Sequence, residues 1–204
     1  GMKWLVRGLE SSPRSLTELH LQANNLNPQS GMSLMDVLPL LTTLSHLNLS
    51  FNYQLGDQVV LALAEWARDY PGLTHLNLEA SGMTHEGYEA LCVALTSQQC
   101  GLVHLNIGHN GIAHAQPSST ERWLLENTTL RTLGLVNSAL QMSPFYAQRQ
   151  ENTTLAEVRG IHQPPTWLCI NAKRHASLED ILELLRLREE EEEIALQARQ
   201  NRHS

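Results

Sequence analysis

A regular spacing of leucines separates apolar from polar positions along this chain. Residues 73–81 read L-x-x-L-x-L-x-x-S, with polar residues between the leucines. In a short β-strand, alternate side chains point to opposite faces, so we expect Leu76 and Leu78 to face a core. His75 and Asn77 would then point to solvent. One such strand cannot bury its apolar side alone, and it needs copies of itself on either side.

The copies are present at a near-constant period. The pattern begins at Leu16, Leu44, Leu73, Leu102 and Leu130, so that successive copies are 28, 29, 29 and 28 residues apart. A sixth, degenerate copy starts at Leu155 and has Val158 at its fourth position. Because chance matches would not keep this spacing, the pattern predicts a protein of about six stacked repeats, each contributing one strand.

Each repeat continues from its strand into a segment whose apolar residues follow helical spacing. We expect helices over residues 57–69 and 86–97, with Asp57 as a candidate cap of the first one. The helix of the first repeat is predicted over residues 33–41, and Pro39 inside it should make it short or kinked.

The two ends of the chain are expected to cover the repeats. Residues 1–14 carry a short apolar face and form either an amino-terminal cap or half of a further repeat. The repeats should span residues 15–170. Residues 166–200 are interpreted as helical, and the segment 171–204 would be a capping helix with an acidic tail. The glutamates at 189–193 have two interpretations, a solvated helix end and an acidic docking segment.

A period of 28 to 29 residues with a helix after each strand resembles the ribonuclease-inhibitor-like class of the leucine-rich-repeat family. The sequence Glu-Asn-Thr-Thr-Leu at 126–130 and again at 151–155 is typical of the helix-to-strand corner of that class. The resemblance covers residues 16 to about 160 and implies an α/β fold, a right-handed solenoid that forms a segment of a horseshoe. Its parallel strands would line the concave face, and its helices would line the convex face.

The ninth position of each repeat is asparagine or serine. Asn24, Asn52 and Asn110 occupy it in three repeats, and Ser81 and Ser138 replace asparagine in two others. We expect this asparagine to hydrogen-bond backbone groups where the strand turns, because buried backbone groups need partners.

Charge and cysteine content narrow the choice of partners. The net charge of −7 opposes binding to a nucleic-acid backbone. No apolar run approaches the roughly 20 residues that are needed to span a bilayer, so no membrane partner is expected. Cys92, Cys100 and Cys169 form no metal-binding pattern, and reduced thiols in a cytoplasmic protein are the simplest interpretation.

The outward-facing positions of the predicted strands form two polar columns. The first reads Glu18, His46, His75, His104 and Thr132, and the second reads His20, Asn48, Asn77, Asn106 and Gly134. Neighbouring strands lie about 4.8 Å apart, so three histidines should stack directly beside three asparagines. Close imidazoles can bind zinc, but a straight column does not converge on one point. We therefore expect no metal and no cofactor. The histidines also match a common repeat consensus, which explains the column without any function.

The sequence favours a non-enzymatic protein–protein interaction module, because a solenoid presents a large, rigid concave surface. We expect a monomer that binds a protein partner on this surface, and no catalytic set can be argued from the spacing. Glu79 is expected near His75 and His104. The candidate contact residues are Glu18, His20, His46, Asn48, Phe51, His75, Asn77, Glu79, His104, Asn106, His109 and Arg131.

Two further families suggest alternative functions. Repeats of this class joined to an acidic tail are similar to the Ran GTPase-activating family, which implies regulation of a small GTPase. The sequence 152–155, followed by Pro164 and a predicted terminal helix, is similar to the carboxyl-terminal domain of tropomodulins, which implies actin binding. An enzyme is the least favoured alternative.

Overall fold

The structure is a computed structural model that describes residues 1–11, 15–112, 115, 117–136, 138, 157–159 and 167–169. The chain divides after Cys169 into two units, and all of the described residues lie in the first unit. The predicted capping helix and acidic tail, residues 171–204, therefore lie outside the described residues.

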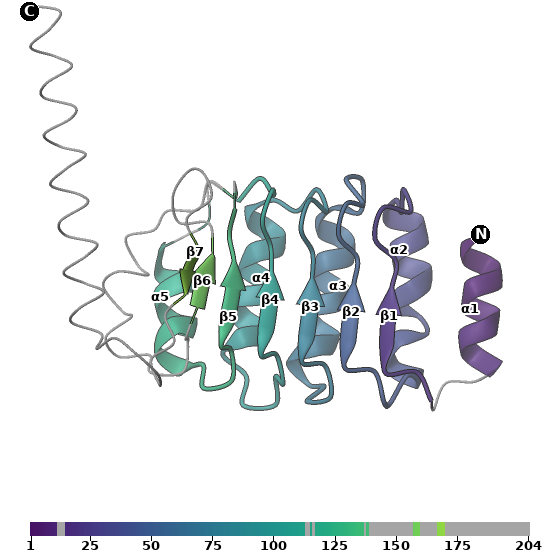
Figure 1. The fold of residues 1–204 in the computed structure, drawn as a ribbon, viewed down its shortest axis with the longest axis horizontal. Helices are drawn as coiled ribbons and strands as arrows, with labels where there is room; N and C mark the ends of the chain where they lie inside the picture. The colour runs from purple at the N-terminus through teal and green to yellow at the C-terminus, as the bar shows by residue number, and fades with distance from the viewer. Residues whose placement is uncertain are drawn as a thin grey trace, which may run out of the picture. The chain divides into compact units, whose positions relative to one another are not determined.

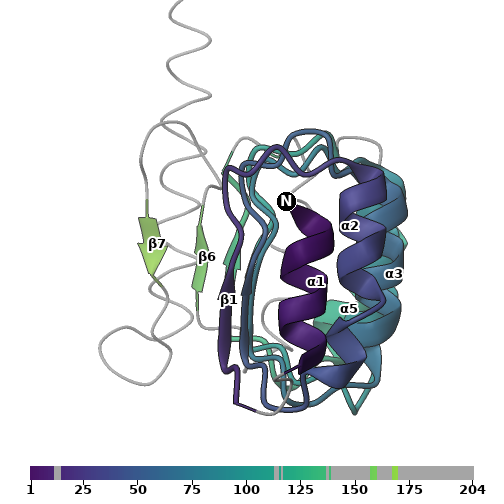
Figure 2. The same cartoon turned by 90° about the vertical axis from the view of Figure 1, so that its right-hand side faces the viewer.

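Short strands alternate with helices along the first unit. The helices are α1 (Met2–Ser11), α2 (Pro28–Met35), α3 (Gly56–Arg68), α4 (His85–Leu95) and α5 (Pro117–Glu126), with a 3-10 helix η1 (Leu38–Leu40). The strands are β1 (Glu18–His20), β2 (His46–Asn48), β3 (His75–Asn77), β4 (His104–Asn106), β5 (Thr132–Gly134), β6 (Glu157–Arg159) and β7 (Trp167–Cys169). The strands stand side by side with the helices behind them (Figure 1), so that sheet and helices form two layers (Figure 2).

The described strands form one open sheet in chain order. Strands β1 to β6 are parallel to their neighbours, and β7 pairs antiparallel with β6. Equivalent repeat positions lie opposite one another, as Leu47, Leu76 and Leu105 do in the pairings of β2, β3 and β4. The predicted fold is confirmed: the unit is a right-handed α/β solenoid with parallel strands on one face and helices on the other. We call the exposed face of the sheet the concave face.

The leucines of the pattern form the core between the two layers. Leu76 and Leu78 are buried, whereas His75 and Asn77 on either side of Leu76 are only half-buried. The same alternation recurs in β2 and β4. Each fully buried leucine contributes about 2 kcal/mol of hydrophobic free energy, so the repeated pattern is the main source of stability.

The ninth-position asparagines organise the turns that follow the strands. The Oδ1 atom of Asn52 accepts hydrogen bonds from the backbone N–H groups of Asn24 and Leu26, at 3.0 and 2.9 Å. Its Nδ2 group donates to backbone carbonyls, including those of Leu21 and Leu49. Asn110 makes the equivalent set of bonds two repeats further along the chain. The predicted role of this asparagine is confirmed for these two positions.

The residue before each of these positions adopts a left-handed backbone. The φ angles of Phe51, Ala80 and His109 are 57°, 52° and 54°. Non-glycine residues rarely adopt this conformation, and a bulky side chain such as that of Phe51 does so at a cost. Asn52 and Asn110, which follow Phe51 and His109, donate to backbone carbonyls of the same turn, and these bonds hold the strained backbone in place.

The first-repeat helix begins earlier than the sequence analysis predicts. Helix α2 starts at Pro28, and the Oδ1 atom of Asn27 caps it by accepting a hydrogen bond from the N–H of Ser30 at 2.9 Å. Pro39 lies in η1 rather than in an α-helix. The prediction over residues 33–41 was wrong because the Asn27-Pro28 dipeptide is itself a helix start signal, with a side-chain cap followed by proline at the first position.

Asp57 does not cap its own helix. Its carboxylate accepts hydrogen bonds from the N–H and the hydroxyl of Thr84, at 2.8 and 2.6 Å, and from the N–H of Gly87 at 3.1 Å. These donors lie at the start of α4, in the next repeat. Asp57 therefore links α3 to the amino terminus of α4, where a negative charge is also favoured by the helix dipole.

The end of the sheet partly departs from the prediction. Val158 of the degenerate copy pairs with Leu133, so the sixth parallel strand is confirmed. Residues 167–169 were interpreted as the start of a helical region, but they form the antiparallel strand β7. Pairing of β7 satisfies backbone groups of β6 that would otherwise be left open at the sheet edge, which is information that helical periodicity does not contain.

Candidate functional site

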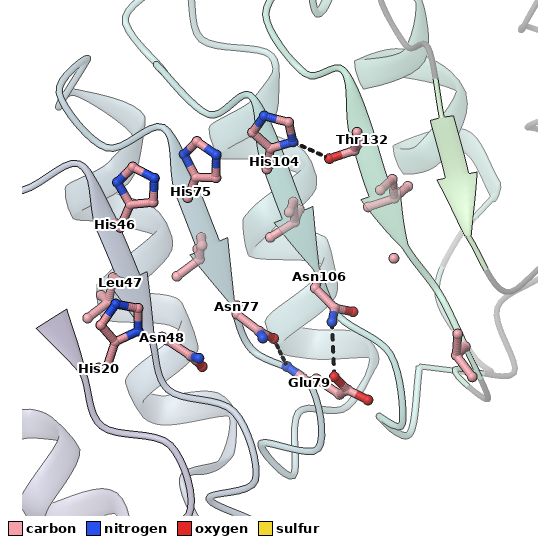
Figure 3. A pocket seen from close by; sticks show the side chains of 15 residues that line it. His20, His46, Leu47, Asn48, His75, Asn77, Glu79, His104, Asn106 and Thr132 are labelled. Atoms are coloured by element: carbon pink, nitrogen blue, oxygen red, sulfur yellow. Dashed lines mark hydrogen bonds between the residues drawn. The ribbon is translucent and has the colours of Figure 1, made fainter. Parts of the chain in front are cut away.

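The concave face contains a groove of about 500 Å³ that runs across the strands (Figure 3). Strands β2 to β5 form its floor at the positions of their buried leucines, and the outward-pointing residues form its walls. Eight of the twelve predicted contact residues line it, namely His20, His46, Asn48, His75, Asn77, Glu79, His104 and Asn106. The other four, Glu18, Phe51, His109 and Arg131, lie outside the groove lining.

Three imidazole rings stack along one side of the groove. The ring centroids of His46 and His75 lie 3.9 Å apart with an interplanar angle of 15°, and those of His75 and His104 lie 4.2 Å apart with an angle of 27°. Both separations are shorter than the strand spacing of about 4.8 Å, so the rings lean toward one another. We call these three residues the histidine stack.

A hydroxyl group holds each ring of the stack. The Nδ1 atom of His46 is hydrogen-bonded to Ser45 at 2.8 Å, and that of His75 is hydrogen-bonded to Thr74 at 2.9 Å. The Nδ1 atom of His104 is bonded instead to Thr132, the residue that replaces histidine in the next strand (Figure 3). These bonds fix the rotation of the rings, so the stack is a preorganised feature of the surface.

The middle ring of the stack, that of His75, is in an unfavourable place for a positive charge. Partial burial lowers the pKa of His75 from its ordinary value of 6.5, and the neighbouring His104 and His46 lower it further. Glu18 acts in the opposite direction. The pKa of Glu18 is itself lowered, mainly by a hydrogen bond with His20 and then by His46.

The asparagine column is fixed by a repeated backbone contact. The Oδ1 atoms of Asn48, Asn77 and Asn106 each accept a hydrogen bond from the N–H two residues further on, at 3.0, 3.0 and 3.1 Å. Each amide therefore presents its Nδ2 group as a donor. Asn106 donates to the carboxylate of Glu79 at 3.0 Å (Figure 3).

Glu79 lies in a different setting from the predicted one. Its carboxylate contacts Asn106 and lies 3.6 Å from the Nε2 atom of His109, and not beside the stacked imidazoles as expected. Glu79 follows the strand, two residues after Asn77, so it belongs to a third outward column at the seventh repeat position. The alternation within each strand predicts only two columns, because it does not extend past the strand end.

Sequence reasoning missed two apolar residues beside the predicted site. Val136, at the seventh position of its repeat, lines the groove and is partly exposed. Tyr53 is 67% exposed and packs edge-to-face with Phe51, with ring centroids 6.4 Å apart. Recognition of the third column would have found Val136. The position of Tyr53 depends on the turn after Asn52, which the repeat pattern does not specify.

Comparison with known proteins provides independent evidence for the fold. A family model described as "Leucine Rich repeat" matches residues 12–35 and 41–64. These two segments of the chain are therefore similar to leucine-rich repeats. No curated protein matches its sequence significantly.

Solved structures share the leucine-rich-repeat fold. The leiomodin-1 structure described as "Actin-Binding Site 2 (ABS2)" is 22% identical, with a TM-score of 0.54, and the match covers 72% of this chain and 91% of that chain. The tropomodulin C-terminal domain from Caenorhabditis elegans is 15% identical, with a TM-score of 0.61, and the match covers 74% and 90% of the two chains. At these identities the likeness establishes the fold, including the predicted similarity to tropomodulin carboxyl-terminal domains.

The concave face is the extended surface of the leucine-rich-repeat fold. Among the described residues, no group of three or more histidine, cysteine, aspartate or glutamate side chains could hold a metal ion. In the same part of the chain, none of the helices has the length and apolar character needed to cross a membrane. Leucine-rich repeats form extended concave surfaces that suit protein–protein interaction.

Proposed function

We propose that this chain is a non-enzymatic module that binds a protein partner on its concave face. The observation that carries the proposal is the groove of about 500 Å³, whose floor is formed by the strands and whose walls include polar side chains held by hydrogen bonds. Fixed side chains lose little conformational entropy when a partner binds, so a preorganised surface supports affinity.

The contact is proposed to extend beyond the groove to one rim. Phe51 and Tyr53 expose 40% and 67% of their surface beside the ends of the strands, and His109 lies on the same row of turns. Aromatic side chains are frequent anchors of protein interfaces because they bury much apolar area with few rotatable bonds. Glu18 and Arg131 would lie at the edges of the contact, where a charge affects association rate more than affinity.

Affinity capture with matched variants tests the proposal. Asn77→Arg places a long charged side chain in the middle of the groove, and Gln58→Arg makes the same charge change on an exposed position of α3. A partner of the concave face should be captured by the wild type and by Gln58→Arg, but not by Asn77→Arg. Melting curves would show that both variants are folded. Capture that is unaffected by Asn77→Arg would place the binding surface elsewhere and reject the proposal.

Actin is a second candidate partner. The leiomodin-1 structure that shares this fold is described as an actin-binding site, and this supports actin as the first protein to test. Co-sedimentation with filamentous actin, together with gel filtration with monomeric actin, would detect binding to either form. Regulation of a small GTPase is tested neither by the structure nor by the comparisons, and it stays a prediction.

We also propose that the module acts in the cytoplasm as a monomer. Cys92 and Cys100 are free and buried in the described part of the chain, which suits a reducing compartment. Burial raises the pKa of both thiols, so neither is activated as a nucleophile.

A further inference from the structure

We infer that His46 and His75 of the histidine stack accept hydrogen bonds from a cationic donor, the lysine or arginine side chains of a basic segment in the partner protein. This inference rests on the proposed function, because it assigns a chemistry to the partner of the concave face. It follows from which nitrogen of each imidazole carries the proton.

The neighbouring hydroxyl groups determine which nitrogen carries that proton. The hydroxyl of Thr74 donates to the backbone carbonyl of Ser45 at 3.1 Å, and the hydroxyl of Ser45 donates to the carbonyl of Thr17 at 3.0 Å. A hydroxyl has one proton, and a carbonyl can only accept. Each hydroxyl oxygen must therefore accept from the imidazole, so Nδ1 of His75 and of His46 carries the proton.

The opposite nitrogen of a neutral ring is then an acceptor. With the proton on Nδ1, the Nε2 atoms of His46 and His75 each present a lone pair. Neither Nε2 atom has a hydrogen-bond partner among the described residues, and both rings line the groove. The concave face therefore presents two neighbouring acceptors, and a side chain that only donates hydrogen bonds is their complement.

The spacing of the rings favours a donor with several N–H groups. The rings are nearly parallel and about 4 Å apart, so equivalent atoms on neighbouring rings have a similar separation. One guanidinium, with five N–H groups in a fork, or one ammonium, with three, can donate to two neighbouring acceptors at once. The asparagine Nδ2 groups beside the stack would then bind carbonyl groups of the same segment.

The charged groups around the groove make it negative, which favours a cationic ligand. Glu79 is the charged residue of the groove lining, and within the described residues no lysine or arginine lines it. Glu18 lies at the β1 end of the stack, and the chain as a whole carries a net charge of −7. Arg131 lies outside the lining. Charge complementarity thus selects a basic segment over an acidic one at neutral pH.

Protonation of the stack should abolish this recognition. A protonated imidazole has no acceptor nitrogen and carries a positive charge, so it would repel a basic segment. The groups that face His75 are His46 and Glu18 toward the amino-terminal side and His104 on the other side, with His20, Glu79 and His109 around the groove. Binding of a basic segment should therefore weaken as pH falls through the histidine range, near pH 6.5 for an ordinary imidazole.

Nuclear magnetic resonance can observe the proton position directly. Long-range ¹H–¹⁵N spectra of the full chain at about pH 8, where histidine is neutral, distinguish the two tautomers of each imidazole. We expect His46 and His75 to be protonated at Nδ1. A proton on Nε2 of both rings would remove the acceptors and overturn the inference.

Three synthetic peptides then test the ligand class. One has arginines separated by glycines, the second replaces each arginine with its neutral analogue citrulline, and the third replaces each with glutamate. The arginine peptide should shift the Nε2 resonances of His46 and His75, and it should bind at least about tenfold more tightly than the citrulline peptide. Preferential binding of the glutamate peptide to the stack would instead assign an acidic partner and overturn the inference.

Matched variants complete the experiment. His75→Phe keeps a stacked ring but removes the nitrogen acceptor, and His85→Phe makes the same change at the start of α4, outside the groove lining. The arginine peptide should bind His75→Phe about tenfold less tightly or worse, and its affinity for His85→Phe should not change. Its affinity for the wild type should fall between about pH 7.5 and about pH 5.5.

The failure of this inference is distinguishable from failure of the proposed function. If the arginine peptide leaves the stack unperturbed while a protein partner is still lost with Asn77→Arg, the concave face binds protein by another chemistry. If the partner is retained by Asn77→Arg, the proposed function itself is rejected.

Discussion

At the scale of single residues, the same residue type has different effects in successive repeats. Asn52 makes buried hydrogen bonds to groups of the preceding turn, whereas the side chain of Asn24, at the same repeat position, donates to the exposed carbonyl of Gln22. The difference arises because Asn52 has a preceding repeat turn whose backbone groups it can satisfy. The energetic value of the ninth-position asparagine is therefore a property of stacking, and it can be measured.

We predict that Asn52→Ala lowers the free energy of unfolding by at least about 3 kcal/mol, because it leaves two backbone N–H groups and several carbonyls without partners. Asn24→Ala should cost less than about 1 kcal/mol, since only an exposed bond is lost. Urea denaturation of both variants measures the two values. Equal losses would contradict the assignment of the buried network to Asn52.

A second residue-scale prediction concerns His75. Its folded pKa is lowered from 6.5, chiefly by burial and then by His104 and His46, so the unfolded chain binds a proton at this site more readily. The contribution of His75 to stability is therefore fully present above about pH 6.5 and is lost as pH falls toward its folded pKa. His75→Gln should flatten stability-against-pH curves in this window. A titration of His75 at or above 6.5, observed by nuclear magnetic resonance, would refute the prediction.

At the scale of elements, successive helices are joined by polar contacts as well as by the core. The carboxylate of Asp57 on α3 binds the first turn of α4, and the hydroxyl of Tyr88 on α4 is hydrogen-bonded to that of Thr120 on α5 at 2.9 Å. The close approach at α4 also requires a glycine, because a Cβ atom on Gly87 would lie 2.6 Å from the Oδ1 atom of Asp57. Each such contact couples one repeat to the next.

We predict that Asp57→Ala lowers the free energy of unfolding by about 1–3 kcal/mol, because donors at the start of α4 lose their acceptor. Asp57→Asn, which keeps one side-chain oxygen, should have a smaller effect. Hydrogen exchange would show faster exchange of the Thr84 and Gly87 amides in the alanine variant. Unchanged exchange at these amides would show that the link between the helices does not depend on Asp57.

At the scale of the whole first unit, each repeat is stabilised mainly by its neighbours. The inward leucines of adjacent strands lie opposite one another, and α2 to α5 pack in sequence along the other layer. In the described part of the chain, the buried apolar residues form one continuous cluster, so the repeats share a core. Nearest-neighbour coupling over so few repeats favours a single unfolding transition.

We predict that fluorescence of the buried Trp123, measured in a variant with phenylalanine in place of Trp4, Trp66 and Trp167, reports the same unfolding midpoint as far-UV circular dichroism, although Trp123 lies in α5. Leu76→Ala should lower the free energy of unfolding by about 2–5 kcal/mol, since it opens a cavity between strands, and the midpoint should fall accordingly. Val93→Ala, at an exposed position of α4, is the matched control and should have little effect. Separate midpoints for the two probes would contradict the single transition.

The placement of the core and of the two polar columns could be predicted from the amino-acid sequence. The repeat period aligns equivalent residues of neighbouring strands, and the alternation within each strand assigns Leu76 to the core and His75 and Asn77 to the surface. Both rules depend on backbone geometry, which is nearly the same in every repeat. This is why the sequence alone predicts the stack of His46, His75 and His104.

Contacts between specific atoms of different repeats could not be predicted from the sequence. The hydroxyl anchors of the histidine stack, the partner of Asp57 and the contact of Glu79 with Asn106 depend on side-chain rotamers and on distances across repeats. Strand β7 likewise depends on an open edge elsewhere in the sheet. Periodicity determines which residues share a face, whereas the packing of the folded chain determines which atoms meet there, because many rotamers are compatible with one repeat pattern.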